Sequence, residues 1–202
     1  MDVLVFGGFL GSGKTTIIGT VLSRLAQSGK VIALIENEIG EVGIDDVFFE
    51  GEGMKVVPLF GGCVCCQISG SLLGALQSLE AEIDPSLVIV EMTGLALTSG
   101  IKEVFGYYAG KALKVRVVSI LDLSRWDKLL LVMGPLLEAQ LEGADLVLLN
   151  KSDLKPPDEA VWAFAKAHAP GARIVTASDR EENPGFVDDV IGLLAHKEGS
   201  DV

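Results

Sequence analysis

Seven short apolar runs, separated by segments long enough for helices, constrain the fold more than any other feature of this 202-residue sequence. The runs cover residues 3–6, 31–35, 55–59, 87–90, 115–121, 146–149 and 173–176. Several are apolar at consecutive positions, which is typical of strands buried on both faces. The intervening helices are predicted over residues 15–27, 69–82, 98–109, 136–142, 157–167 and 185–195. This alternation predicts an α/β fold, with a mostly parallel sheet and helices on both faces.

Composition narrows the class of protein further. With 49% hydrophobic residues, the chain has ample material for a core, and we expect one domain over residues 1–195 and a frayed tail over 196–202. The net charge of −12 and only 6% aromatic residues argue against nucleic-acid binding. No signal peptide precedes the first run, and the apolar stretch at 129–137 is too short to cross a membrane. We therefore expect a cytoplasmic protein without a membrane partner.

A phosphate-binding loop follows the first predicted strand. Residues 8–15 fit the pattern of a glycine, four residues, then Gly-Lys-Ser/Thr. Gly8, Gly11 and Gly13 allow backbone N–H groups, including that of Ser12, to approach phosphates. In this pattern Lys14 binds the β- and γ-phosphates, and the Thr15 hydroxyl binds Mg²⁺. Thr16 follows in the first turn of the next helix, whose N-terminal dipole favours anions. The pattern predicts a P-loop NTPase.

A second motif indicates which base is bound. The predicted strand 146–149 runs directly into Asn150, Lys151, Ser152 and Asp153. The Asp153 carboxylate can accept hydrogen bonds from guanine N1–H and the 2-amino group, which adenine cannot match. Lys151 would lie along the base, and Asn150 would brace the loop. A plain turn is the alternative interpretation, because Asn and Asp are common in turns. Residues 176–178, after the last strand, are weaker candidates for a further contact to the base.

A carboxylate also ends the fourth predicted strand. Glu91 follows residues 87–90 and precedes Met92, Thr93 and Gly94. An acidic residue at this place is typical of the second metal-binding motif of P-loop enzymes, which holds Mg²⁺ directly or through water. The Gly94 N–H could then approach the γ-phosphate. No glutamine follows Gly94 to position a water molecule, so we expect slow intrinsic hydrolysis.

Three cysteines lie within four residues, at Cys63, Cys65 and Cys66. An odd and clustered set does not indicate a disulfide framework, and soft thiolates suit Zn²⁺ or another thiophilic ion. The alternative is that one or two cysteines are simply buried. The acidic segment 36–45 lies where the first nucleotide-sensing loop would be, and its carboxylates could bind Mg²⁺ or complete the cysteine site.

Together these segments resemble the CobW-like P-loop GTPases, relatives of the nickel-insertion GTPases that mature urease and hydrogenase. The matching segments are residues 7–16, 36–45, 62–66, 91–96 and 150–153, in the family's order. The resemblance implies a GTPase coupled to metal delivery, with zinc or cobalt bound by Cys63, Cys65 and Cys66. Glu36 and Glu41 are the additional ligands that it implies. Many members carry a C-terminal domain, which we expect this chain to lack.

Three functions remain open from the sequence. The first is a GTP- and GDP-binding, Mg²⁺-dependent metallochaperone that serves a client metalloenzyme or cofactor protein, with a homodimer as one way to assemble the site. The second is a GTPase that activates or remodels a corrinoid protein or metalloenzyme and uses its cysteines only structurally. The third is a phosphate-loop kinase of a small metabolite, against which the guanine motif argues.

Overall fold

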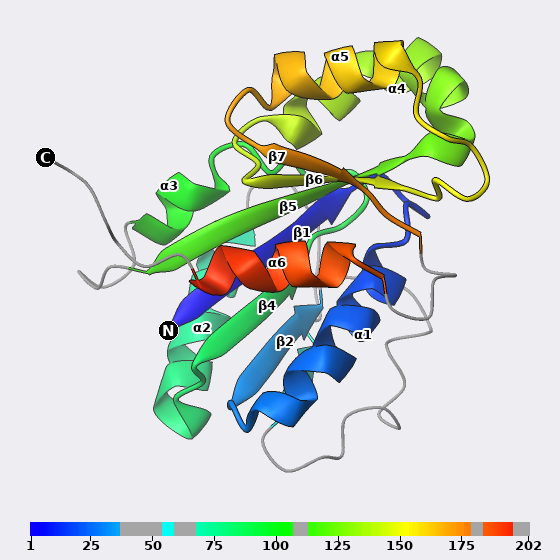
Figure 1. Ribbon diagram of the computed structural model, residues 1–202. Coiled ribbons are helices and arrows are strands. Elements are labelled where there is room, and N and C mark those ends of the chain that lie inside the picture. The colour runs from blue at the N-terminus through cyan, green and yellow to red at the C-terminus, as the bar shows by residue number, and fades with distance from the viewer. Residues whose placement is uncertain (37–53, 59–67, 107–112, 179–183, 196–202) are drawn as a thin grey trace, which may run out of the picture.

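The computed structural model describes residues 1–36, 54–58, 68–106, 113–178 and 184–195 (Figure 1). Among these residues there are seven strands, and a helix follows each of them except β2, after which residues 37–53 lie outside the described part. The strands are β1 (Asp2–Gly8), β2 (Ile32–Glu36), β3 (Met54–Pro58), β4 (Leu87–Glu91), β5 (Lys114–Asp122), β6 (Leu146–Asn150) and β7 (Arg173–Thr176). The helices are α1 (Lys14–Leu25), α2 (Ile68–Ile83), α3 (Ile101–Gly106), α4 (Trp126–Leu141), α5 (Glu159–His168) and α6 (Phe186–Ala195), with short 3₁₀ turns at Ala26–Ser28 and Leu123–Arg125.

The strands form one sheet in the order β3-β2-β4-β1-β5-β6-β7. Every described pair is parallel, so the mostly parallel sheet predicted from the sequence is parallel throughout this part of the chain. β1 lies at the centre, with Val3 in register with Val88 of β4 and Val115 of β5. β1, β4 and β6 are almost wholly buried, which explains why their sequences are apolar at consecutive positions.

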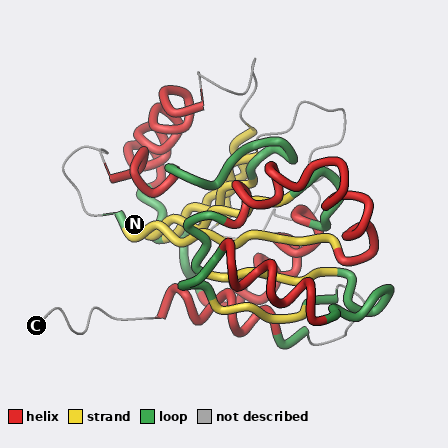
Figure 2. The backbone as a smooth tube through the Cα atoms, turned by 90° about the horizontal axis from the view of Figure 1, so that it is seen from above, coloured by secondary structure: helices red, strands yellow, loops and turns green. Residues whose placement is uncertain are grey.

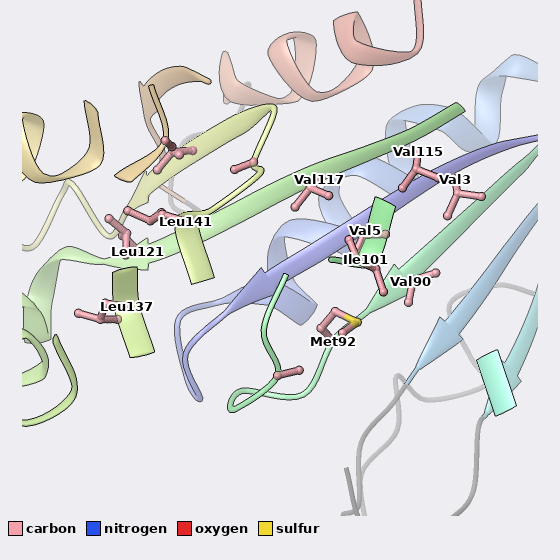
Figure 3. Close-up of a cluster of buried hydrophobic side chains, with 14 of the residues drawn as sticks. Val3, Val5, Val90, Met92, Ile101, Val115, Val117, Leu121, Leu137 and Leu141 are labelled. Atoms are coloured by element: carbon pink, nitrogen blue, oxygen red, sulfur yellow. The ribbon is translucent and has the colours of Figure 1, made fainter. Parts of the chain in front are cut away.

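Helices cover both faces of the sheet, as the sequence predicted (Figure 2). Alternate side chains of a strand point to opposite faces. Val3 and Val5 belong to a core shared with α2, α3, α4 and α5, whereas Leu4 and Phe6 pack with α1 and α6. In the first core, Leu121 lies with Leu137 and Leu141 of α4 (Figure 3). The parallel arrangement brings the carboxyl ends of all strands to one edge, here called the carboxyl edge.

Three predicted helices begin two or more residues away from the predicted position. The helix predicted at 136–142 is the second half of α4, which already begins at Trp126. Its first half was missed because the apolar run at 129–133 shows no helical period, and Leu131 and Val132 are exposed although Leu129 is buried. Non-helical backbone at Met133 kinks the helix two residues before Pro135.

The helix predicted over residues 98–109 was wrong at its start. Residues 93–100 form a loop, α3 begins at Ile101, and residues 107–109 lie outside the described part of the chain. Thr98 leaves the helix because its hydroxyl donates to the backbone oxygen of Gln140 on α4, at 2.8 Å. Likewise α5 starts at Glu159 rather than 157, because the Asp158 side chain caps the N–H of Val161.

Other predictions fall on residues that the structure does not describe. They concern Glu41, the cysteines at 63, 65 and 66, and the tail 196–202. No helix among the described residues is long and apolar enough to cross a membrane.

Candidate nucleotide site

Described residues of four of the five sequence-predicted segments lie at the carboxyl edge, on the neighbouring strands β2, β4 and β1 and on β6, which β5 separates from β1. The phosphate loop (residues 8–15) follows β1, Glu91 ends β4, Glu36 ends β2, and Asn150 ends β6. In open parallel sheets this edge is where ligands bind.

The phosphate loop leads directly into α1. Gly13 has a left-handed backbone, with φ 95°, and Lys14 is the first residue of the helix. Gly8 also has positive φ, and a Cβ there would lie 2.5 Å from the backbone oxygen of Ile120. The Lys14 side chain is buried, and its ammonium donates to the backbone oxygens of Gly8 and Phe9 at 3.2 and 3.4 Å. An ammonium that is buried against the backbone of the phosphate loop is well placed to bind a phosphate there.

A hydroxyl and a carboxylate meet beside this loop. The Thr15 hydroxyl donates to Glu91 Oε1 at 2.8 Å, and Glu91 is 2% exposed. Magnesium–oxygen distances of about 2.0–2.1 Å place adjacent ligands of an octahedral ion about 2.9 Å apart, so these oxygens suit a hydrated Mg²⁺. Glu36 ends the neighbouring strand in direct register with Glu91. Thr16 is exposed in the same turn of α1.

The predicted guanine motif braces the phosphate loop. The fully buried Asn150 donates from Nδ2 to the backbone oxygen of Ser12 at 2.7 Å, and Lys151 donates from Nζ to that of Gly11 at 2.7 Å. Lys151 has positive φ, at 62°, so the chain turns sharply where β6 ends. The exposed Asp153 accepts a hydrogen bond from Ser178 at 3.0 Å. Asn150 and Lys151 are therefore hydrogen-bonded to the phosphate loop, and guanine binding by this segment stays a prediction.

Residues 176–178, a weak candidate in the sequence, support Asp153. The backbone oxygen of Ala177 accepts from both the N–H and the hydroxyl of Ser152, at 3.2 and 3.0 Å. The Ala177 N–H donates to Leu149. The loop after β7 thus fixes the segment that carries Asp153.

Two further residues were missed in the sequence, Asp122 at the end of β5 and Arg125 in the 3₁₀ turn that follows. Asp122 Oδ2 accepts from Arg125 Nε at 2.7 Å and from Lys151 Nζ at 2.8 Å, and Oδ1 accepts from the N–H and hydroxyl of Ser124. Burial raises the pKa of Asp122, but hydrogen bonds from Lys151, Ser124 and Arg125 outweigh burial, so this pKa lies below its ordinary value. The carboxylate is therefore ionised at neutral pH. A carboxylate directly after an apolar strand was the signal that could have found it.

Gln140 of α4 was also missed. Its side-chain nitrogen donates to the backbone oxygens of Gly94 and Ala96, both at 3.1 Å. Gly94 in turn packs against the phosphate loop, since a Cβ there would lie 2.5 Å from the Leu10 nitrogen. The loop after Glu91 is thus held between α4 and the phosphate loop. Nothing in the local sequence around 140 indicates this contact.

Ser12 Oγ and Asn150 Oδ1 are among the buried polar atoms that have no hydrogen-bond partner in the described structure. Buried polar atoms without partners are rare and commonly mark a place where a ligand binds. Both lie where the phosphate loop and the guanine motif meet, so the residues present fit a bound nucleotide. Among the described residues, no group of three or more His, Cys, Asp or Glu forms a metal cluster.

Substituting Gly13 with alanine is expected to weaken nucleotide binding severely. Left-handed backbone costs a non-glycine residue about 1–2 kcal/mol, and the new Cβ would collide with the Asn150 amide. Both effects displace Asn150 from the Ser12 oxygen. Fluorescence titration with a labelled GDP should show at least a tenfold weaker affinity, by roughly 1.4 kcal/mol or more. Gly19→Ala on α1, where a Cβ meets no atom within 4 Å, is the matched control. Equal affinities in the two variants would contradict the expectation.

An all-parallel sheet with a phosphate loop after its central strand and Asn-Lys-Ser-Asp after β6 defines a P-loop GTPase domain. The family model described as "CobW/HypB/UreG, nucleotide-binding domain" matches residues 2–175, so the chain belongs to this family. The resemblance found in the sequence is thereby confirmed.

Curated relatives are consistent with this family assignment. The chain is 32% identical over 162 residues to the zinc chaperone YjiA of Escherichia coli, covering 75% of this chain and 49% of that protein. It is 30% identical over 168 residues to a zinc-regulated GTPase metalloprotein activator of Schizosaccharomyces pombe, covering 76% of this chain and 39% of that protein. The chain thus spans half or less of the length of these relatives.

Solved structures show the same fold. The hydrogenase maturation factor HypB of Archaeoglobus fulgidus superposes with a TM-score of 0.69 at 19% identity, covering 96% of this chain and 89% of that one. The Zn(II)-bound YjiA GTPase of E. coli superposes with a TM-score of 0.60 at 24% identity, covering 95% and 62%.

Proposed function

We propose that this chain binds and hydrolyses GTP and uses its nucleotide state to control a thiophilic metal at Cys63, Cys65 and Cys66. In this role it supports insertion of the metal, or of a metal-containing cofactor, into a client protein. The proposal is supported by family membership and by relatives named zinc chaperones. Zinc is the metal that these names favour, and thiolates are ligands suited to it.

The strand order is the observation that carries the coupling. β3, β2, β4 and β1 are consecutive in the sheet. Cys63 follows the end of β3 by five residues, Glu36 ends β2, Glu91 ends β4, and the phosphate loop follows β1. Neighbouring strands lie about 4.8 Å apart, so three spacings, roughly 15 Å, separate the end of β3 from the phosphate loop. β3, which precedes the cysteines in the sequence, therefore ends at the same edge as the nucleotide site, with Glu36 and Glu91 on the strands between them.

In the proposed GTP complex each part of the site has one role. Gly8, Gly11, Ser12, Gly13, Lys14, Thr15 and Thr16 bind the phosphates, together with Gly94. Thr15 and Glu91 hold Mg²⁺, which neutralises charge on the phosphates when bound. Asp153 selects guanine, with Asn150 and Lys151 supporting it.

Hydrolysis is proposed to be slow without a partner. The Gln140 amide is buried and already donates to Gly94 and Ala96, so it is not placed to orient an attacking water. A client protein or a second copy of the chain would supply what is missing. A cytoplasmic location agrees with this role, and residues 1–195 are proposed to form its single domain.

The test is a metal titration of the reduced protein, with Zn²⁺ as the probe, in the presence of GDP and of a non-hydrolysable GTP analogue. We expect tight binding that changes at least about fivefold between the two nucleotides, the usual lower range of coupling between sites. Cys65→Ser should lose most of the affinity, because one thiolate ligand is removed. Glu82→Gln, an exposed carboxylate near the end of α2, is the matched control and should bind as the wild type does.

Two outcomes would overturn the metallochaperone proposal. One is zinc binding that does not need Cys65. The other is zinc binding of equal strength with GDP and with the GTP analogue. Either result would leave a GTPase that acts on a partner and uses its cysteines structurally, and the search would turn to a GTP-dependent pull-down of that partner.

A further inference from the structure

Three consecutive carbonyl oxygens of the phosphate loop each accept a hydrogen bond from a side chain outside the loop. Leu10 O accepts from Arg125 Nη2 at 2.6 Å, Gly11 O from Lys151 Nζ at 2.7 Å, and Ser12 O from Asn150 Nδ2 at 2.7 Å. We call these the three loop carbonyls. Two of the three donors are cations, and such charge-assisted bonds are stronger than neutral ones.

Holding these oxygens also sets the direction of the loop amides. A trans peptide unit is planar, so its C=O and the N–H of the next residue point in opposite directions. Fixing the three loop carbonyls toward Arg125, Lys151 and Asn150 therefore turns the N–H groups of residues 11, 12 and 13 toward the inside of the loop. The Ser12 N–H donates across the loop to Phe9 O, at 3.0 Å. Inward N–H groups are the donors that a phosphate needs.

The Asp122 carboxylate pairs with both cationic donors, Arg125 and Lys151. Its Oδ2 accepts from Arg125 Nε and from Lys151 Nζ, and its side chain is fully buried. Arg125 therefore uses two different nitrogens, Nε toward Asp122 and Nη2 toward Leu10 O. A lysine has a single nitrogen on a flexible stem and does not reproduce this fork. β5 lies between β1 and β6, so Asp122 is at the one strand end that reaches both loops.

We propose that Asp122 and Arg125 are positioning residues for the guanine nucleotide, which set its affinity and residence time by orienting the phosphate-loop amides. Neither residue needs to touch the nucleotide. The inference rests on the proposed binding of GTP and GDP at this loop, and adds residues that the phosphate-loop and guanine motifs do not contain. Arg125 is 40% exposed, and Lys151 still pairs with the fully buried Asp122 carboxylate when Arg125 is replaced. The effect of an Arg125 substitution on the nucleotide therefore separates from its effect on folding.

The experiment measures dissociation of a fluorescent GDP by stopped flow, together with steady-state GTP hydrolysis. Arg125→Ala should speed GDP dissociation about tenfold, which is about 1.4 kcal/mol, and raise KM while kcat changes little. On a logarithmic scale, the GDP dissociation rate of Arg125→Lys should lie closer to that of Arg125→Ala than to that of the wild type. Asp122→Asn should have the larger effect, because it releases Lys151 as well. Arg173→Ala is the matched control, since Arg173 begins β7 at the opposite edge and pairs with Asp189.

The outcomes separate this inference from the proposed function. Dissociation from Arg125→Ala at the rate of Arg173→Ala would overturn the positioning role, and so would full rescue by lysine. A fall in kcat with unchanged KM would overturn it too, because amide orientation acts on binding. Absence of saturable GDP binding by the wild type would instead reject the proposed function itself. Asp122→Asn removes a buried charge from two ion pairs and is expected to destabilise the fold. The positioning role is therefore judged from the Arg125 variants.

Discussion

Replacing Lys14 with alanine is expected to lower the affinity for GTP about a hundredfold and to stop measurable hydrolysis. The ammonium is buried beneath the loop, within reach of two loop carbonyls, and in the complex it would exchange them for phosphate oxygens. Two charge-assisted bonds at about 1.5 kcal/mol each amount to roughly 3 kcal/mol, or about two decades in affinity. Calorimetric titration with GTP and a phosphate-release assay measure both effects.

The fold should survive this substitution. Burying an ammonium costs desolvation, so its removal offsets the lost hydrogen bonds. Thermal unfolding should therefore shift little, which distinguishes a binding defect from unfolding. Lys166→Ala, on the exposed side of α5, should match the wild type in every assay. GTP binding by Lys14→Ala at wild-type strength would mean that the phosphates do not bind at this loop.

Asp153→Asn is expected to change which nucleotide the protein prefers. Guanine offers two donors, N1–H and the 2-amino group, and a carboxylate accepts both. The asparagine amide replaces one acceptor with a donor, which conflicts with guanine but matches the 2-carbonyl of xanthine. GDP affinity should fall about a hundredfold and XDP affinity should rise, because mismatched polar groups cost strongly in a built site. Competition titrations with GDP, XDP and ADP measure the change.

The surroundings of Asp153 make this a test of one contact. Ser178 and the Ala177–Ser152 bonds hold the segment in place, and an asparagine of the same shape leaves them largely intact. Asp127→Asn on α4, an exposed carboxylate paired with Lys155, is the control. Unchanged GDP affinity in Asp153→Asn, or a wild type that binds ADP as well as GDP, would refute guanine selection by this residue.

Much of the fold could be predicted because burial leaves a direct trace in the sequence. A strand covered on both faces is apolar at consecutive positions, as in β1, β4 and β6, and each of the seven predicted runs overlaps one of the seven described strands. The positions of the phosphate loop, Glu91 and Asn150 at strand ends could be predicted because their motifs place particular residue types at fixed spacing, while their roles in binding stay predictions. The sequence also located Glu36, which lies in register with Glu91.

The missed parts depend on partners far away in the chain. The bond from Arg125 to Leu10 joins residues 115 positions apart, and no local pattern around either one indicates it. The Gln140 side chain, on α4, donates to the backbone oxygen of Gly94, 46 positions earlier in the chain. The start of α4 was missed because its first turns carry apolar residues on exposed positions as well as buried ones. The pairings of such side chains are decided by the tertiary structure, not by periodicity.

The parallel sheet also leaves an opposite edge, formed by the amino ends of the strands, with no part in the chemistry discussed above. Gly171, in the turn between α5 and β7, is exposed there, and a Cβ at this position meets no atom within 4 Å. Its φ lies outside the left-handed range, so an ordinary side chain fits its backbone. A dye or a tether attached at this turn would therefore leave the nucleotide face open to solution, which makes it a suitable anchoring point for single-molecule or surface-based measurements.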